Sequence, residues 1–223
     1  MKRYKNNWGS FISQKEQKQL LSKTIVIIGV GGNGGYTLEY FSRLGVKKII
    51  FFDGDIFEES NLNRQIYCNK NTLSQNKAIV AYEKIKNINP SIQLEYYPKM
   101  FSMEDISMIM NADIIIDCTD GLTVEILQEI NKLHIPYAFQ GNIEQGSIVS
   151  IFNNSYFFNI FLNEIKQEEK IITPVISQPA YLCALTACLV CNEVVKFLLH
   201  KPCAIGYYLV YDIINNTLKK EFI

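Results

Sequence analysis

The sequence lacks a net charge, a long uninterrupted apolar run and internal repeats. Its 22 Lys and Arg residues balance 22 Asp and Glu residues in a chain of 223 residues. The molecule as a whole therefore offers no strong field for nucleic acid or an anionic membrane surface. The most apolar stretch, residues 180–199, is interrupted by Asn192, Glu193 and Lys196. Fewer than about 18 consecutive apolar residues are available there, so we expect a buried helix and no membrane span.

An export signal is also missing from the first residues. Polar side chains follow the basic residues Lys2, Arg3 and Lys5, where a signal peptide would place its apolar stretch. The six cysteines are spread through a chain large enough to fold without disulfides. We therefore expect a cytoplasmic protein with reduced thiols. With 48% hydrophobic and 20% charged residues, the composition is that of a globular protein.

Strand and helix patterns alternate along most of the chain. A β-branched run at 24–28, a helical pattern at 32–44 and a second strand at 47–52 form a βαβ unit. The run Ile114-Ile115-Ile116 is typical of a strand buried on both faces, which favours a mainly parallel sheet covered by helices. The other expected elements are a helix at 74–87, a strand at 92–97, a short helix that opens at Ser102 with Asp105 in a capping box, a strand at 113–117, a helix at 124–133, strands at 136–139 and 147–152, a helix at 181–199, and a hairpin of strands 207–213 and 217–222.

A glycine-rich turn separates the first predicted strand from the first predicted helix. Gly29, Gly31 and Gly34 have the spacing that permits a tight turn and a close backbone approach, and the free N–H groups at the helix start attract a phosphate. Asp53 lies nineteen residues after Gly34, at the end of the next strand. There it can accept hydrogen bonds from ribose hydroxyls. The motif predicts an adenine-nucleotide site, but alone it does not separate a nicotinamide cofactor from ATP.

Three polar segments follow that narrow the choice. They are Asp53-Gly54-Asp55, then Asn61-Leu62-Asn63-Arg64-Gln65 with Lys77 on the next helix, and Asp117-Cys118-Thr119-Asp120. All fall at the carboxyl ends of strands or in the turns just beyond, where doubly wound sheets bind their ligands. Two cations and an acid near a phosphate cradle suit a triphosphate with Mg²⁺ better than a hydride carrier.

With these motifs the sequence resembles the ThiF/MoeB/HesA family of ubiquitin-activating-enzyme-like adenylyltransferases, from Arg3 to the final hairpin. The resemblance implies an α/β, Rossmann-like, doubly wound fold whose mainly parallel sheet carries a C-terminal antiparallel hairpin extension. It implies that ATP and Mg²⁺ convert a carboxylate to an acyl-adenylate with release of pyrophosphate. The family's usual substrate is the C-terminal glycine of a small ubiquitin-like or sulfur-carrier protein, and its usual assembly is a homodimer.

The resemblance also implies a role for each motif residue. Arg64 and Lys77 would bind the phosphates, Asp120 would bind Mg²⁺, and these three are the predicted catalytic residues. Asp53 would bind the ribose. The remaining residues of the predicted nucleotide site are Gly29, Gly31, Gly32, Gly34, Asp55, Asn61 and Gln65.

The sequence departs from the family pattern in four places, one of which is Gly121 beside the predicted metal ligand, where relatives commonly have Asn. Many relatives carry a second Arg in an N-terminal Arg-Tyr-x-Arg segment that reaches the partner subunit's ATP site, but here Asn6 takes that position. Either Arg3 or Lys5 replaces that Arg, or the contact with the partner subunit is weakened. Only one Cys-x-x-Cys pair, Cys188 with Cys191, is present, so no structural zinc is expected. Residues 153–178 contain no cysteine that could form a thioester, and Cys183 is the nearest candidate. We therefore expect the chemistry to end at the adenylate.

These observations predict a single domain over residues 1–223, and they leave alternatives for its function. The domain would comprise an N-terminal arm and helix (1–23), a nucleotide-binding core (24–152), a crossover loop (153–179), and a C-terminal helix and hairpin (180–223). A short biosynthetic peptide rivals a carrier protein as the substrate. A catalytically silent nucleotide-binding subunit of a heteromeric enzyme is a second hypothesis. An NAD-dependent dehydrogenase is a third, although it does not explain the Asn-x-x-Arg-Gln segment.

Overall fold

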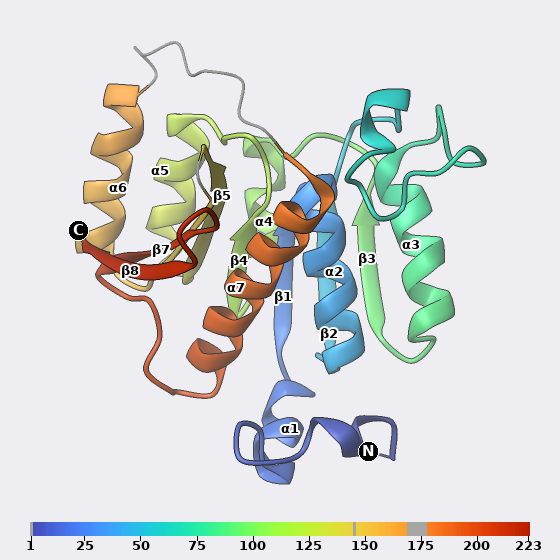
Figure 1. The fold of residues 1–223 in the computed structure, drawn as a ribbon, viewed down its shortest axis with the longest axis horizontal. Coiled ribbons are helices and arrows are strands. Elements are labelled where there is room, and N and C mark those ends of the chain that lie inside the picture. The colour runs from blue at the N-terminus through green and yellow to red at the C-terminus, as the bar shows by residue number, and fades with distance from the viewer. Residues whose placement is uncertain (1, 145, 169–177) are drawn as a thin grey trace.

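The computed structural model describes residues 2–144, 146–168 and 178–223, and these form an eight-stranded sheet with helices on both faces (Figure 1). The strand order is β3-β2-β1-β4-β5-β6-β7-β8. The strands are β1 (Thr24–Ile28), β2 (Lys48–Phe52), β3 (Gln93–Tyr97), β4 (Ile114–Asp117), β5 (Tyr137–Ile143), β6 (Gly146–Phe152), β7 (Tyr207–Asp212) and β8 (Thr217–Phe222). The helices are α1 (Gln14–Leu20), α2 (Gly32–Leu44), α3 (Lys77–Ile88), α4 (Ile106–Ile109), α5 (Val124–Lys132), α6 (Ser155–Glu168) and α7 (Ala180–Leu198), with 3-10 turns η1 (Lys2–Asn7), η2 (Glu59–Asn61) and η3 (Met103–Asp105).

The first five strands form the parallel part of the sheet. Strand β1 lies between β2 and β4, and its last residue, Ile28, is paired with Phe52 of β2 and Asp117 of β4. The carboxyl ends of these strands therefore meet at one edge, where the polar segments of the sequence begin. This arrangement confirms the predicted doubly wound α/β fold.

The antiparallel part of the sheet is larger than the predicted C-terminal hairpin. That hairpin is present as β7 and β8, which pair from Tyr207 with Phe222 to Asp212 with Thr217. Strands β5 and β6 are antiparallel as well, and β6 pairs with β7 in the same sense. The turn between β5 and β6 is too short for a helical crossover, so these two strands can only pair antiparallel.

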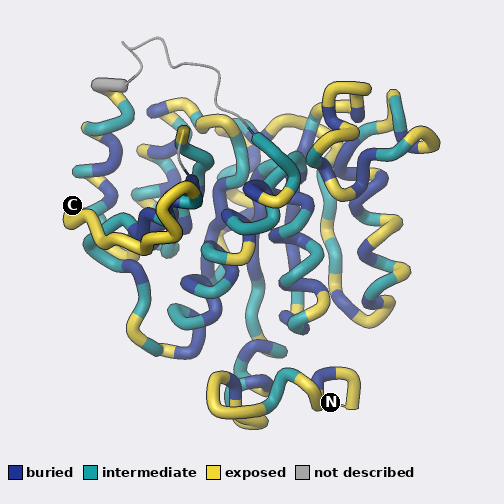
Figure 2. Tube along the Cα trace, viewed as in Figure 1, coloured by how far each residue is buried: buried dark blue, intermediate teal, exposed yellow. Residues whose placement is uncertain are grey.

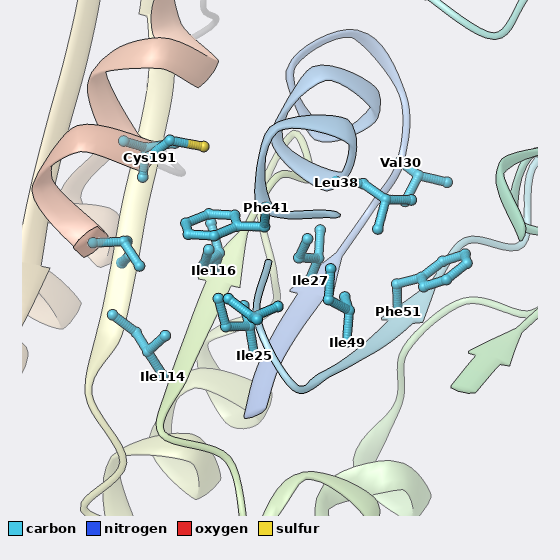
Figure 3. Packing of buried hydrophobic residues seen from close by; sticks show 14 of the residues in the cluster. Ile25, Ile27, Val30, Leu38, Phe41, Ile49, Phe51, Ile114, Ile116 and Cys191 are labelled. Atoms are coloured by element: carbon cyan, nitrogen blue, oxygen red, sulfur yellow. The ribbon is translucent and has the colours of Figure 1, made fainter. Parts of the chain in front are cut away.

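Two hydrophobic clusters cover the two faces of the sheet. Ile25 and Ile27 of β1 belong to the cluster beneath α2, α3 and α7 (Figure 3). The alternate residues Val26 and Ile28 belong to the second cluster, beneath α4, α5 and α6. Successive side chains of a strand point to opposite faces, so a strand buried on both sides must be apolar at every position.

Helix α6 corrects the prediction of a crossover loop. Residues 155–168 are helical, whereas the loss of periodicity in the sequence predicts a crossover loop there. Phe158, Phe161 and Leu162 are buried in the second cluster, and Ile165 packs against it. Their spacing of three, four and seven residues places them on one helical face. Asn159 and Asn163 between them, and exposed Tyr156 before them, obscure that period. Residues 169–177 of the predicted loop lie outside the described residues.

Helix α7 packs in the position expected for a buried helix. Its length and composition would suit a membrane span, but more than half of its apolar window is buried inside the protein, against α2, β5 and β6. Figure 2 shows that exposed residues gather along β8 and on the outer sides of the helices instead. The apolar character of α7 thus reflects its place over the sheet.

Candidate active site

A cavity of about 270 Å³ opens at the carboxyl edge of the parallel strands. Nine of the eleven predicted site residues line it, so segments as far apart in the sequence as Gly29 and Asp120 converge there. These nine are Gly29, Gly31, Gly32, Asp53, Asp55, Arg64, Gln65, Lys77 and Asp120. Gly34 and Asn61 are not part of the lining.

The glycine turn is shaped by close backbone contacts. Gly29 has φ of +86°, and a Cβ there would lie 2.8 Å from the carbonyl oxygen of Cys118. A Cβ on Gly34 would lie 2.1 Å from the carbonyl oxygen of Gly29. Gly34 therefore acts by allowing α2 to start close to β1, and not by lining the cavity. The start of α2 has no side-chain cap, so its N–H groups remain available to a ligand.

Asp53 is anchored at the end of β2 by its own backbone surroundings. Its Oδ2 accepts a hydrogen bond from Val30 N at 2.8 Å, and its Oδ1 accepts one from Asp55 N at 2.9 Å. Burial raises the pKa of Asp53, while these hydrogen bonds and the Lys77 ammonium lower it. Each oxygen keeps a further lone pair that can accept a hydroxyl hydrogen of a ribose.

Arg64 and Gln65 follow a tight turn that Asn61 holds in place. Asn61 Oδ1 accepts a hydrogen bond from Glu58 N, and the Asn61 carbonyl accepts from both Arg64 N and Gln65 N. Asn61 thus shapes the turn that carries Arg64 and Gln65 and does not itself line the cavity. Arg64 Nε and Gln65 Oε1 are buried without a hydrogen-bond partner among the described residues. Such atoms are rare, and because both residues line the cavity a ligand bound there can complete their hydrogen bonding.

Lys77 is a buried cation at an electrostatically unfavourable position. It is the first residue of α3, where the helix dipole repels positive charge. Its side chain is 8% exposed, and Nζ forms an ion pair with Asp55 Oδ2 at 3.0 Å. Asn76 caps the helix and also donates to the carbonyl of Asp53, which fixes α3 against the end of β2. A buried ammonium held at a helix start is well placed for an anionic ligand.

Asp120 lies in the turn after β4 and is exposed. Among residues 2–144, 146–168 and 178–223, no three His, Cys, Asp or Glu side chains gather to hold a metal ion by themselves. Proteins bind Mg²⁺ through one or two carboxylates together with substrate phosphates and water, and the exposed carboxylate of Asp120 on the cavity wall is a ligand of that kind. Asp120 is the candidate ligand on the protein side.

The apolar part of the cavity was not predicted from the sequence. Ile28, Phe52, Met100 and Phe101 line it beside the ribose-binding candidate Asp53. Met100 and Phe101 follow β3, and a Cβ on Gly54 would lie 2.6 Å from Met100 N, so this glycine lets the β3 loop pass over the end of β2. The position of Met100 and Phe101 at the end of a parallel strand was the available signal. Flat apolar and aromatic surface of this kind suits a purine base.

The family model described as "ThiF family" matches residues 4–222. The chain belongs to the ThiF family. The "Probable molybdopterin-synthase adenylyltransferase" of Porphyra purpurea is 34% identical over 141 residues, which are 59% of this chain and 37% of that protein. The "Sulfur carrier protein ThiS adenylyltransferase" of Escherichia coli (strain K12) is 33% identical over 116 residues, 52% of this chain and 45% of that protein.

The fold also matches solved structures of E. coli MccB. MccB with ATP has a TM-score of 0.75 and 20% identity, and the match covers 93% of this chain and 65% of that one. At this identity the match shows the fold of the ThiF-family chain. The chain spans less than half the length of the two curated relatives named above.

Proposed function

We propose that this ThiF-family chain is an ATP-dependent adenylyltransferase that activates a C-terminal carboxylate. The product would be an acyl-adenylate, and pyrophosphate would leave. The observation that carries the proposal is the convergence of Arg64, Lys77 and Asp120 on one cavity beside the glycine turn. The names of curated relatives, which include adenylyltransferases of sulfur carriers, support it.

The cavity offers a place for each part of ATP. The purine base would pack against Met100 and Phe101, the ribose hydroxyls would donate to Asp53, and the phosphates would follow the start of α2 toward Arg64 and Lys77. The lining supplies both kinds of surface, since it combines the apolar residues Phe52, Met100 and Phe101 with the charged residues Arg64, Lys77 and Asp120.

The proposed reaction requires stabilisation of the negative charge on the phosphate oxygens and positioning of the acceptor carboxylate at the α-phosphorus. A carboxylate oxygen of the acceptor attacks the α-phosphorus, and the bond between the α-phosphorus and the bridging oxygen breaks as pyrophosphate leaves. Arg64 and Lys77 donate to phosphate oxygens on which negative charge accumulates. A C-terminal carboxylate is already ionised near pH 7, so no general base is required. Bound Mg²⁺, held by Asp120 and the phosphates, would add further charge neutralisation.

The proposed acceptor is a small ubiquitin-like or sulfur-carrier protein, or a short peptide. The name of the E. coli relative favours a carrier protein. E. coli MccB in a second structure, with MccA, has a TM-score of 0.77 at 20% identity over 93% of this chain. A short peptide is kept as the second candidate acceptor. Both acceptors present the same group to the cavity, a terminal carboxylate.

A homodimer is proposed from the family resemblance, and the N-terminal arm bears on it. Tyr4 is buried against Gly45, and Arg3 donates to Asn89 Oδ1 of its own chain. The arm lies near α1, at the end of the molecule opposite the carboxyl edge of the sheet (Figure 1). Because Arg3 is held by its own chain, exposed Lys5 is the better candidate for a contact with a partner's phosphates.

Exchange of labelled pyrophosphate into ATP tests the proposed function. We expect label in ATP only when Mg²⁺ and an acceptor with a free C-terminal carboxylate are both present. The same acceptor with an amidated C-terminus is the matched control and should give no exchange. ATP binding without exchange for carriers and peptides alike would instead favour the silent nucleotide-binding subunit.

A further inference from the structure

Asp117, at the end of β4, is a buried carboxylate that the proposed reaction does not use. Its Oδ1 accepts hydrogen bonds from Thr119 N at 2.9 Å and from Thr119 Oγ1 at 2.7 Å. Thr119 Oγ1 in turn accepts from Gly121 N at 3.1 Å. Asp117 thus binds Thr119 directly and Gly121 only through Thr119, and these two residues flank Asp120, the candidate metal ligand. Asp117 itself does not line the cavity.

The second oxygen of Asp117 is held from the neighbouring strand. Tyr137, the first residue of β5, donates its hydroxyl to Asp117 Oδ2 at 2.5 Å. Its side chain is fully buried, and its ring packs with Phe158 and Phe161 of α6 at centroid distances of 5.1 and 6.0 Å. A ring fixed in this way gives the phenol oxygen one position. Tyr137 of β5 therefore fixes one oxygen of the Asp117 carboxylate, and Thr119, which lines the cavity, fixes the other.

We propose that Tyr137 is a positioning residue that acts through Asp117 and Thr119 to hold Asp120 in place for Mg²⁺ and ATP. This inference rests on the proposed function, since it deepens the role of Asp120 in that site. The relay comprises Tyr137, Asp117, Thr119 and Gly121. Burial raises the pKa of Asp117 above its usual value, and the hydrogen bonds from Tyr137 and Thr119 oppose part of that rise.

Removal of the Tyr137 hydroxyl should loosen the turn without emptying the core. Tyr137→Phe keeps the ring and its packing, but it leaves Asp117 Oδ2 without its donor in a buried position. An unpaired buried carboxylate oxygen is unfavourable, so the Asp117 side chain can rotate toward another donor and away from Thr119. The effect should appear at the amides of Thr119 and Gly121, whose acceptors are Asp117 and Thr119.

Hydrogen exchange in the ligand-free full chain tests the relay independently of catalysis. We expect Tyr137→Phe to speed exchange at the Thr119 and Gly121 amides by about tenfold, the size expected for loss of a hydrogen bond to a charged group. Tyr208→Phe is the matched control, because the Tyr208 hydroxyl donates to Glu164 of α6 within the same aromatic cluster. Its exchange at Thr119 and Gly121 should equal that of the wild type.

Calorimetry then tests the link to Asp120. In the presence of a non-hydrolysable ATP analogue, Tyr137→Phe should weaken apparent Mg²⁺ affinity by about five- to tenfold and leave metal-free binding of the analogue unchanged. In an Asp120→Asn background, adding Tyr137→Phe should change the Mg²⁺ affinity no further, because the relay acts through Asp120. If Tyr137→Phe folds poorly, Thr119→Val serves as the second variant, because it removes the hydroxyl that donates to Asp117 and accepts from Gly121 N. It should also speed exchange at the Gly121 amide.

Wild-type exchange at Thr119 and Gly121 in a folded Tyr137→Phe would overturn the proposal, as would equal losses of Mg²⁺ affinity in Tyr137→Phe and Tyr208→Phe. Failure of the wild-type protein to bind the analogue with Mg²⁺ would refute the proposed function instead. The exchange experiment needs no ligand, so the two failures are distinguishable.

Discussion

Asp120→Ala is expected to lower the acceptor-dependent pyrophosphate exchange rate by at least about a hundredfold. Asp120 is the one carboxylate of the turn after β4 that both lines the cavity and is exposed to a ligand. Without it, Mg²⁺ would be held by the phosphates and water alone, and the charge on the departing pyrophosphate would be less well neutralised. Steady-state exchange over a range of Mg²⁺ concentrations measures the effect.

Glu125→Ala is the matched control for that substitution. Glu125 is an exposed carboxylate in the first turn of α5, five residues from Asp120 and outside the cavity lining. Its removal should leave the exchange rate within about twofold of the wild type. A wild-type exchange rate in Asp120→Ala would show that Asp120 does not bind the metal ion.

Lys77→Met is expected to reduce the exchange rate by about 10²- to 10³-fold, mainly through loss of charge at the transferring phosphate. Methionine keeps most of the apolar stem, so packing at the start of α3 is retained. The partner Asp55 is 56% exposed, and its carboxylate can be solvated when the ion pair is lost. Because a cation at a helix start opposes the helix dipole, thermal stability should be unchanged or slightly higher.

The combination of lost activity and retained stability separates a binding role from a structural one. Lys84→Met, an exposed lysine on the same helix, should change neither property. A marked fall in melting temperature in Lys77→Met, with exchange per folded molecule unaltered, would mean that the Lys77–Asp55 ion pair serves the fold.

Much of the parallel half of the fold could be predicted because its signals are local. The strand before Gly29, the Ser102 capping box with Asp105, and the apolar run at Ile114 each depend on a few neighbouring residues. The convergence of Asp53, Lys77 and Asp120 also followed from a general rule, since parallel strands present their carboxyl ends at one edge. The residues of the cavity could therefore be anticipated before their contacts were known.

The remaining features depend on contacts between distant segments. Asp117 and Tyr137 lie twenty residues apart in sequence, and only the pairing of β4 with β5 brings them together. The role of Asn61 depends on the hydrogen bond that its side-chain oxygen accepts from Glu58 N, and sequence spacing does not specify that partner. Helix α6 was missed because its apolar face is interspersed with asparagine and exposed tyrosine.

Calorimetric titration of the wild-type chain with ATP and Mg²⁺, and separately with NAD⁺, tests the central claim most directly, with Lys77→Met titrated in parallel. The triphosphate assignment predicts that ATP binds at one site, that NAD⁺ gives no binding heat, and that Lys77→Met weakens ATP by at least about tenfold. Binding of NAD⁺ without binding of ATP, or an ATP affinity in Lys77→Met equal to that of the wild type, would contradict it.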